Sequence, residues 1–198
     1  MLRTMCKPIL LCGATAMLAI GNHAYAQQPS LSYDYVEVGA TKGEISNIDY
    51  TAYGLGGSFS LNNAIFMSAD YANGTSDKKY FGSKIDIDAY SIGLGYHTAI
   101  NSKTDFVTSL SYIKNEVDFA RFNDNTNAYG IDVGVRSMVL PNVELAAIAS
   151  YVDSSDADGE IGFNLNAKFF VSPVLAVTLG YTDGDDISGV SAGLRLNF

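Results

Sequence analysis

The chain has 198 residues, with 21 Asp and Glu against 12 Lys and Arg, and its net charge is -9 at pH 7. This length fits one domain, or two small ones at most. The acidic balance argues against a nucleic-acid partner, because phosphates would repel the protein. Both cysteines lie among the first twelve residues, so we expect no disulfide and no thiolate site in the rest of the chain.

The first 26 residues have the pattern of a secretory signal. A basic start at Arg3 and Lys7 precedes an apolar stretch, and the motif AYA, ending at Ala26, supplies the small residues that a signal peptidase reads. The alternative is a lipoprotein signal at Cys12, which has Leu11 where a small residue is expected. We therefore predict a signal peptide over residues 1–26 and a mature domain over residues 27–198.

The rest of the chain alternates between apolar and polar residues, which is typical of strands. Ten such segments lie over residues 31–42, 48–61, 64–74, 85–97, 104–115, 127–138, 142–152, 160–170, 173–182 and 187–198. Short turns alternate with longer or more acidic connections over residues 43–47, 75–84, 116–126, 153–159 and 183–186. A meander with short turns at one end and polar loops at the other is the layout of an outer-membrane barrel.

The two faces of each segment decide between a soluble and a membrane protein. In residues 85–97, Ile92 and Leu94 alternate with Ser91 and Gly93. A soluble barrel would place many charges opposite its apolar face, whereas small and polar residues suit a narrow lumen. We predict an all-β, antiparallel, up-and-down transmembrane β-barrel of ten strands that closes by pairing the last strand with the first. Eight strands are the alternative, if one weak segment is a loop.

The face opposite the apolar one also carries charges. They are Glu37, Asp70, Asp132, Arg136, Glu144, Lys168 and Arg195. Inside a sealed lumen these charges have to pair, since an isolated buried ion is very costly. We predict that Arg195 on the last strand meets Glu37 on the first.

Aromatic residues on the apolar face provide a check on the orientation. If the N-terminus is periplasmic, one group falls near the extracellular ends and another near the periplasmic ends, as interfacial anchoring requires. The extracellular group is Tyr71, Tyr90, Tyr112, Tyr129, Tyr151 and Tyr181, and the periplasmic group is Phe59, Tyr96, Phe106 and Phe198.

The stretches SYDYVEVGAT, FMSADYANG and YSIGLGYHTAINSKTDFVTSLSYIK and the closing LRLNF resemble small outer-membrane β-barrels of Gram-negative bacteria. The group contains OmpX- and OmpA-type barrels, and the likeness is greatest to the porin-like family regulated by diffusible signal factor. The resemblance covers nearly all of residues 31–198. It implies that the barrel-assembly machinery reads the strand ending in Phe198. It says little about function, because such barrels host adhesins, enzymes, stabilisers and pores.

Catalysis has little support in the sequence. Enzymes among outer-membrane barrels use a histidine at the outer rim as a base that activates water or a hydroxyl. After the leader the one histidine is His97, which should face inward near the periplasmic edge. We therefore expect no enzyme and no cofactor.

We also expect no metal site, because the acidic turns lack the full spacing of a calcium loop. A weak divalent-cation site is the alternative, with the candidates Asp156, Asp158, Asp185 and Asp186.

These observations favour a non-enzymatic, structural or porin-like barrel with a narrow or plugged polar lumen. The alternative is adhesion, or contact with a host or with lipopolysaccharide, through extracellular loops such as the one carrying Lys78, Lys79 and Lys84. We expect a monomer in the outer membrane of a Gram-negative bacterium. Its partners would be membrane lipid, lipopolysaccharide and the barrel-assembly machinery, and not nucleic acid.

Overall fold

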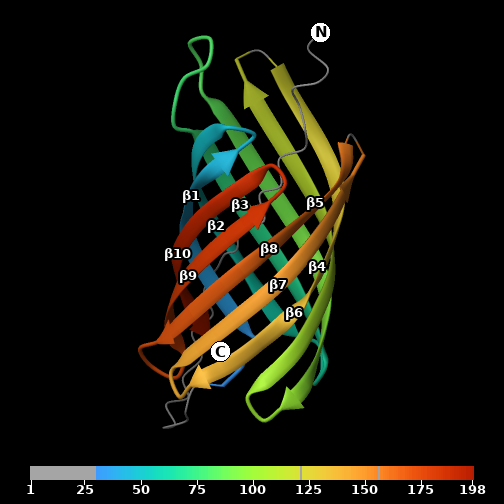
Figure 1. Cartoon of the computed structure of the whole chain (residues 1–198), viewed down its shortest axis with the longest axis vertical. Coiled ribbons are helices and arrows are strands. Elements are labelled where there is room, and N and C mark those ends of the chain that lie inside the picture. Colours follow the sequence, from blue (N-terminus) through green and yellow to red (C-terminus); the bar gives the residue numbers. More distant parts are fainter. Residues whose placement is uncertain (1–29, 121, 156) are drawn as a thin grey trace.

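Figure 1 shows a computed structural model of the chain, which describes residues 30–120, 122–155 and 157–198. The predicted leader, residues 1–26, lies outside the described residues. The strands are β1 (Tyr35–Ile45), β2 (Ile48–Ser60), β3 (Ile65–Ser76), β4 (Ile85–Asn101), β5 (Thr104–Phe119), β6 (Phe122–Leu140), β7 (Val143–Ser154), β8 (Ala157–Phe170), β9 (Leu175–Gly184) and β10 (Ile187–Asn197). Within the part of the chain that the structure describes, no helix is long and apolar enough to cross a membrane.

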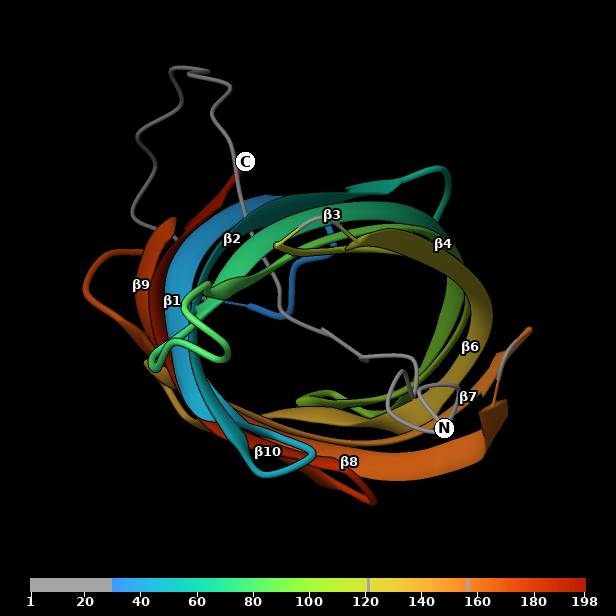
Figure 2. The same ribbon diagram turned by 90° about the horizontal axis from the view of Figure 1, so that it is seen from above.

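Each strand pairs antiparallel with its neighbours in the chain, and β10 pairs with β1 to close the barrel. Figure 2, a view from above, shows the strands as one ring. They lie inclined to the long axis in Figure 1, as the closure of a sheet requires. The prediction of an all-β, up-and-down barrel of ten antiparallel strands is confirmed, and the eight-stranded alternative is wrong.

The strand boundaries differ most from the predicted ones in three places. β1 begins at Tyr35, because residues 31–34 leave the ladder and turn inward. The predicted loop over residues 116–126 is largely strand, since β5 and β6 continue until Phe119 pairs with Phe122. Similarly, β7 and β8 extend into the loop predicted over residues 153–159. In both hairpins the apolar alternation stops before the backbone ladder does.

The connections fall at two ends of the barrel. The turns after β2, β4, β6 and β8 lie at the end that holds the C-terminus, which we call the C-terminal end. The other connections lie at the opposite end, which we call the loop end. The longest described connection there is residues 77–84 between β3 and β4, which extends well beyond the rim in Figure 1.

The outward face of the barrel is apolar. On β4, Tyr90, Ile92, Leu94 and Tyr96 are exposed, whereas Gly93 between them is buried on the inner face. Exposed apolar side chains continue around the ring, for example Leu55, Met67, Leu110, Ile131, Leu165, Leu179 and Leu194. A continuous apolar surface of this extent is poorly suited to water and well suited to lipid hydrocarbon.

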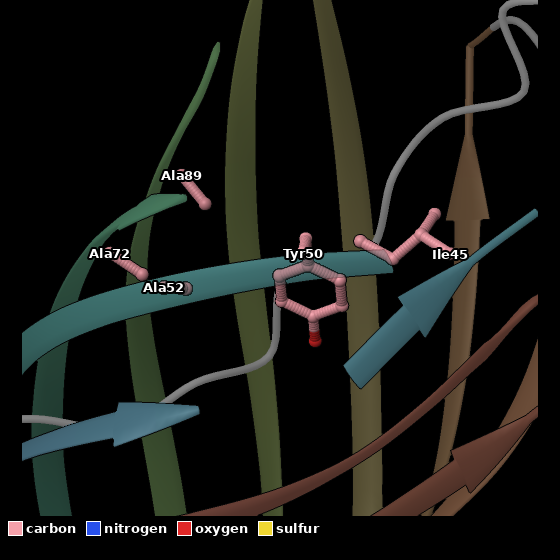
Figure 3. Close-up of a cluster of buried hydrophobic side chains, with 5 residues drawn as sticks. All are labelled: Ile45, Tyr50, Ala52, Ala72 and Ala89. Atoms are coloured by element: carbon pink, nitrogen blue, oxygen red, sulfur yellow. The ribbon is translucent and has the colours of Figure 1, made fainter. Parts of the chain in front are cut away.

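The interior changes character along the barrel. Toward the loop end, Figure 3 shows an apolar cluster formed by Ile45, Tyr50, Ala52, Ala72 and Ala89 on β1 to β4. The middle of the lumen is lined mainly by serine, threonine, asparagine and glycine. The C-terminal end holds most of the charged side chains. The lumen therefore has three zones along the barrel. Its polar and charged side chains lie mainly in the middle zone and at the C-terminal end.

Candidate functional site in the barrel lumen

An ion cluster lies on one wall of the lumen at the C-terminal end. It consists of Arg136 on β6, Glu144 on β7 and Lys168 on β8. Arg136 donates from Nε to Glu144 Oε1 at 2.8 Å and from Nη2 to Oε2 at 3.2 Å, and Lys168 Nζ donates to Oε1 at 2.6 Å. The antiparallel register sets Glu144 directly opposite Lys168. The Glu144 side chain is only 1% exposed, so two cations share one fully buried carboxylate.

A second ion pair lies where the barrel closes. Glu37 on β1 is the register partner of Arg195 on β10, and both Nε and Nη2 of Arg195 lie 2.6 Å from Glu37 Oε2. The guanidinium also stacks over the ring of Tyr35 at 3.5 Å from the ring centre. The pairing of Glu37 with Arg195 that the sequence predicts is thus present in the structure.

The two remaining predicted charges do not pair with cations. Asp70 accepts a hydrogen bond from the hydroxyl of Ser91 at 3.1 Å. Asp132 accepts from the hydroxyls of Ser109 and Ser150 at 2.8 and 2.6 Å. The expectation that every lumen charge has an oppositely charged partner is therefore wrong. Neighbouring strands place hydroxyls beside these carboxylates, and hydrogen bonds to hydroxyls stabilise the ionised form in place of a cation.

The segment of residues 31–34, which we call the strap, crosses the C-terminal mouth of the barrel. Tyr33 is 5% exposed, and its hydroxyl donates to Asp105 at 3.0 Å. Its ring stacks on His97 at 3.7 Å between ring centres and on Phe66 at 4.9 Å. The guanidinium of Arg136 lies over the same ring, 4.4 Å from its centre. Tyr33 thus contacts β3, β4, β5 and β6 at once.

Sequence reasoning missed the strap because LSYDY alternates like the start of a strand. The weak signal that could have found it is the aromatic pair Tyr33 and Tyr35 on the inward-facing positions, where the other segments carry mostly small residues. Gly95 on β4 gives the space that such rings need, since a Cβ there would meet the ring of Phe66.

His97 faces inward near the C-terminal end, as predicted. Its Nδ1 lies 3.3 Å from Asp105 Oδ2, and the Tyr33 ring covers one face of the imidazole. Asp105 therefore binds both His97 and Tyr33. This geometry holds the strap against the wall.

A cavity of about 310 Å³ lies above the ion clusters. Asp70 and Asp132 line it together with hydroxyl and amide side chains such as those of Ser68, Asn166 and Thr178. The cavity is bounded toward the C-terminal end by Arg136, Lys168, Arg195 and the strap residue Tyr33. The lumen is therefore a polar chamber with ion clusters on its walls at the C-terminal end.

The predicted aromatic belt residues lie on the outer face. Tyr71 contacts Tyr90 and Tyr112 contacts Tyr129 in tilted ring pairs, with 5.0 and 5.6 Å between ring centres. Five further residues of the predicted belt are exposed, namely Phe59, Tyr96, Tyr151, Tyr181 and Phe198. Phe106 is half-buried on the same face of β5. The backbone N–H of Phe198 donates to the carbonyl of Asp34 at 3.1 Å, which ties the chain end to the start of β1.

At the loop end the acidic candidates do not form a metal site among the described residues. Asp185 accepts a hydrogen bond from the backbone N–H of Ile161 at 3.3 Å. Asp156 lies outside the described residues, and the side chain of Asp158 is not described. In residues 77–84, Lys78 pairs with Asp49 at 2.7 Å, and this hydrogen bond raises the pKa of Lys78.

The closed ladder and the continuous apolar outer face together decide the class of protein. With every strand paired, no backbone edge is left open to hydrocarbon. The chain is a transmembrane β-barrel.

Comparison with known proteins adds likenesses of shape. No family model and no curated protein sequence matches the chain. Among solved structures, KdgM porin is 9% identical with a TM-score of 0.46, over 82% of this chain and 99% of that one. Neisserial surface protein A is 16% identical with a TM-score of 0.44, over 84% and 98%. The β domain of the Bordetella autotransporter BrkA is 13% identical with a TM-score of 0.49, over 83% and 98%. Likenesses at these identities and TM-scores do not bear on function.

Proposed function

We propose that the protein is a non-enzymatic, porin-like β-barrel of a Gram-negative outer membrane whose lumen is closed to bulk diffusion. The observation that carries the proposal is the filled C-terminal end, where Tyr33 of the strap lies between the walls and contacts Arg136 of the ion cluster. We place this end in the periplasm and the loop end outside the cell. The proposed partners are lipid, lipopolysaccharide and, through Phe198, the barrel-assembly machinery, and the proposed state is a monomer.

A structural role of His97 supports the non-enzymatic part of the proposal. Its Nδ1 faces Asp105, and one ring face is covered by Tyr33. A general base needs a free nitrogen within hydrogen-bond reach of water or a hydroxyl at an accessible site. His97 is instead enclosed at the narrow end of the lumen, where its side chain is 16% exposed.

The proposal predicts that the purified wild-type protein is silent in planar lipid bilayers. We expect no steady conductance in 1 M KCl (on the order of ten times physiological ionic strength), even at high protein load, because the ion clusters narrow the path and the Tyr33 ring closes its centre. Gel electrophoresis checks that the added protein is folded: the unheated protein should run as a compact band, and heating should remove that band. Steady openings of the folded wild type would contradict the proposal.

One observation favours surface interaction as a second candidate function. In residues 77–84, Phe81 is 99% exposed, and both Phe81 and Gly82 have positive φ, at 49° and 90°. Hydrogen bonds between the backbones of Tyr80 and Ser83 hold this turn in place. An ordered aromatic tip between lysines suits an anionic partner such as lipopolysaccharide phosphate. Deleting residues 78–83 should then abolish that binding while the barrel stays folded.

A further inference from the structure

The strap spans the C-terminal mouth from one wall to the other. At the β1 side, the Asp34 carboxylate accepts hydrogen bonds from the backbone N–H of Ser60 at 2.6 Å and from its hydroxyl at 2.9 Å. At the far side, Leu31 packs against Met138, Phe170 and Ala176 on β6, β8 and β9. Between these anchors, the Ser32 carbonyl accepts from Arg136 Nη2 at 2.9 Å. The strap therefore lies across the opening itself.

The ion clusters, by contrast, lie along the walls. Arg136, Glu144 and Lys168 occupy three adjacent strands, so their bonds run around the ring. Glu37 and Arg195 likewise belong to neighbouring strands at the closure. The strap joins walls of the C-terminal mouth that none of these ion pairs connects, from Asp105 on β5 to the cluster of Met138, Phe170 and Ala176. The strap thus closes the centre of the path, whereas the ion clusters line its walls.

Apart from the Asp34 carbonyl, which accepts from the backbone N–H of Phe198, the strap is held by contacts that involve side chains and not by a strand ladder. Tyr33 has one hydrogen bond to Asp105 and ring contacts, and the ladder pairs of β1 begin only at Tyr35. These contacts are few beside the closed set of ladders that holds the ten strands. The strap can therefore leave the mouth while the ten strands stay paired. The turn between Ser32 and Asp34, closed by hydrogen bonds of 3.0 and 3.1 Å, gives it its own local structure.

Behind the strap, the chamber favours positive ions. Asp70 and Asp132 accept hydrogen bonds from serine hydroxyls and form no ion pair with any other described residue, and the charged groups that act on Asp70 are Glu37, Arg195 and Asp132. Toward the C-terminal end, Arg195 pairs with Glu37, and Arg136 and Lys168 share Glu144, so with Asp70 and Asp132 these lumen residues carry four carboxylates against three cations. Carboxylates lining a narrow polar path select cations, because they attract counter-ions and repel anions.

We propose that the strap is a displaceable gate, and that the lumen behind it conducts small monovalent cations selected by Asp70 and Asp132. The proposal rests on the proposed function, a barrel that is closed at rest, and adds the part that opens and the class of ion that passes. Displacing Tyr33 leaves the walls intact and joins the polar chamber to the periplasmic mouth.

The test is bilayer conductance of the full protein, purified from membranes, with the double substitution Leu31→Ala and Tyr33→Ala. These substitutions remove the Leu31 anchor and the Tyr33 ring, and neither changes a residue that belongs to a strand. The matched control is Tyr53→Ala, since Tyr53 is 66% exposed on the outer face of β2. We expect steady openings from the double variant only, and a reversal potential in a KCl gradient that indicates preference for K⁺. Adding Asp70→Asn and Asp132→Asn should lower the ratio of K⁺ to Cl⁻ permeability several-fold.

Each outcome separates the two proposals. Steady conductance of the wild type would overturn the closed resting state, and with it the gate. A silent wild type with a silent, folded double variant would overturn the gate alone and leave the wall clusters as the closure. Openings that prefer Cl⁻, or that keep their selectivity after both Asn substitutions, would overturn the role of the carboxylates. If neither the double variant nor Tyr33→Ala alone gives the compact gel band, the strap belongs to the folded core and is not a gate.

Discussion

Replacing Glu144 with alanine is expected to lower the free energy of unfolding by about 3–5 kcal/mol, the cost typical of removing one partner from a buried ion pair. The reason is specific to the cluster. Glu144 is the shared partner of Arg136 and Lys168, so a single substitution leaves two buried cations without their carboxylate. The chain has no tryptophan. Urea unfolding in lipid is therefore followed by the fraction of unheated protein that runs as the compact gel band.

Two further variants isolate the charge effect at Glu144. Glu44→Ala removes a carboxylate from an exposed, outward-facing position of β1 and should leave the urea midpoint almost unchanged. Adding Arg136→Met and Lys168→Met to Glu144→Ala should recover much of the loss, because no unpaired charge then remains in the lumen. A change within about 0.5 kcal/mol for Glu144→Ala, the range of ordinary surface substitutions, would contradict the buried cluster.

Leu94→Arg is expected to destabilise the folded barrel in lipid by about 2–4 kcal/mol, the cost of arginine on a lipid-facing site near the middle of a membrane barrel. Leu94 is 53% exposed on the outer face of β4 and lies between the belt residues Tyr90 and Tyr96. The same urea titration in vesicles gives the difference in free energy between variant and wild type.

The control for Leu94→Arg lies on the same strand. Ile100 is 59% exposed near the C-terminal turn of β4, beyond Tyr96. Ile100→Arg should cost only about 0–1 kcal/mol, because side chains near the interface reach water. Equal, small effects of both substitutions would mean that the outer face of β4 meets water, which would contradict the membrane assignment.

The sequence could predict the fold because one physical pattern repeats ten times. Strand alternation fixes which side chains face outward, and the closure of the barrel sets β10 beside β1. Glu37 and Arg195 could be paired in advance for this reason, since each lies at an inward position of a closing strand. The placement of His97 near the narrow end follows from the same alternation.

The missed features depend on contacts that no local pattern reports. Whether residues 31–34 extend β1 or fold inward depends on a space beside Phe66 and Gly95, which are distant in sequence. Asp132 has hydroxyl partners because Ser109 and Ser150 face it from both neighbouring strands. Such neighbours become visible only when the register of three strands is known together. The ladder between β5 and β6 near Phe119 consists mostly of polar residues, so apolar alternation does not mark it as strand.

The seam between β1 and β10 has a consequence for how the barrel is made. The hydrogen bond from Arg195 to Glu37 joins residues 158 positions apart, close to the full span of the barrel domain. Contacts of such long sequence separation form late and slowly, because a large loop must be closed first. The ring cannot be completed until β10 has been synthesised and exported. Until then both terminal strands present open edges, so the nascent chain has to be kept from pairing with other chains.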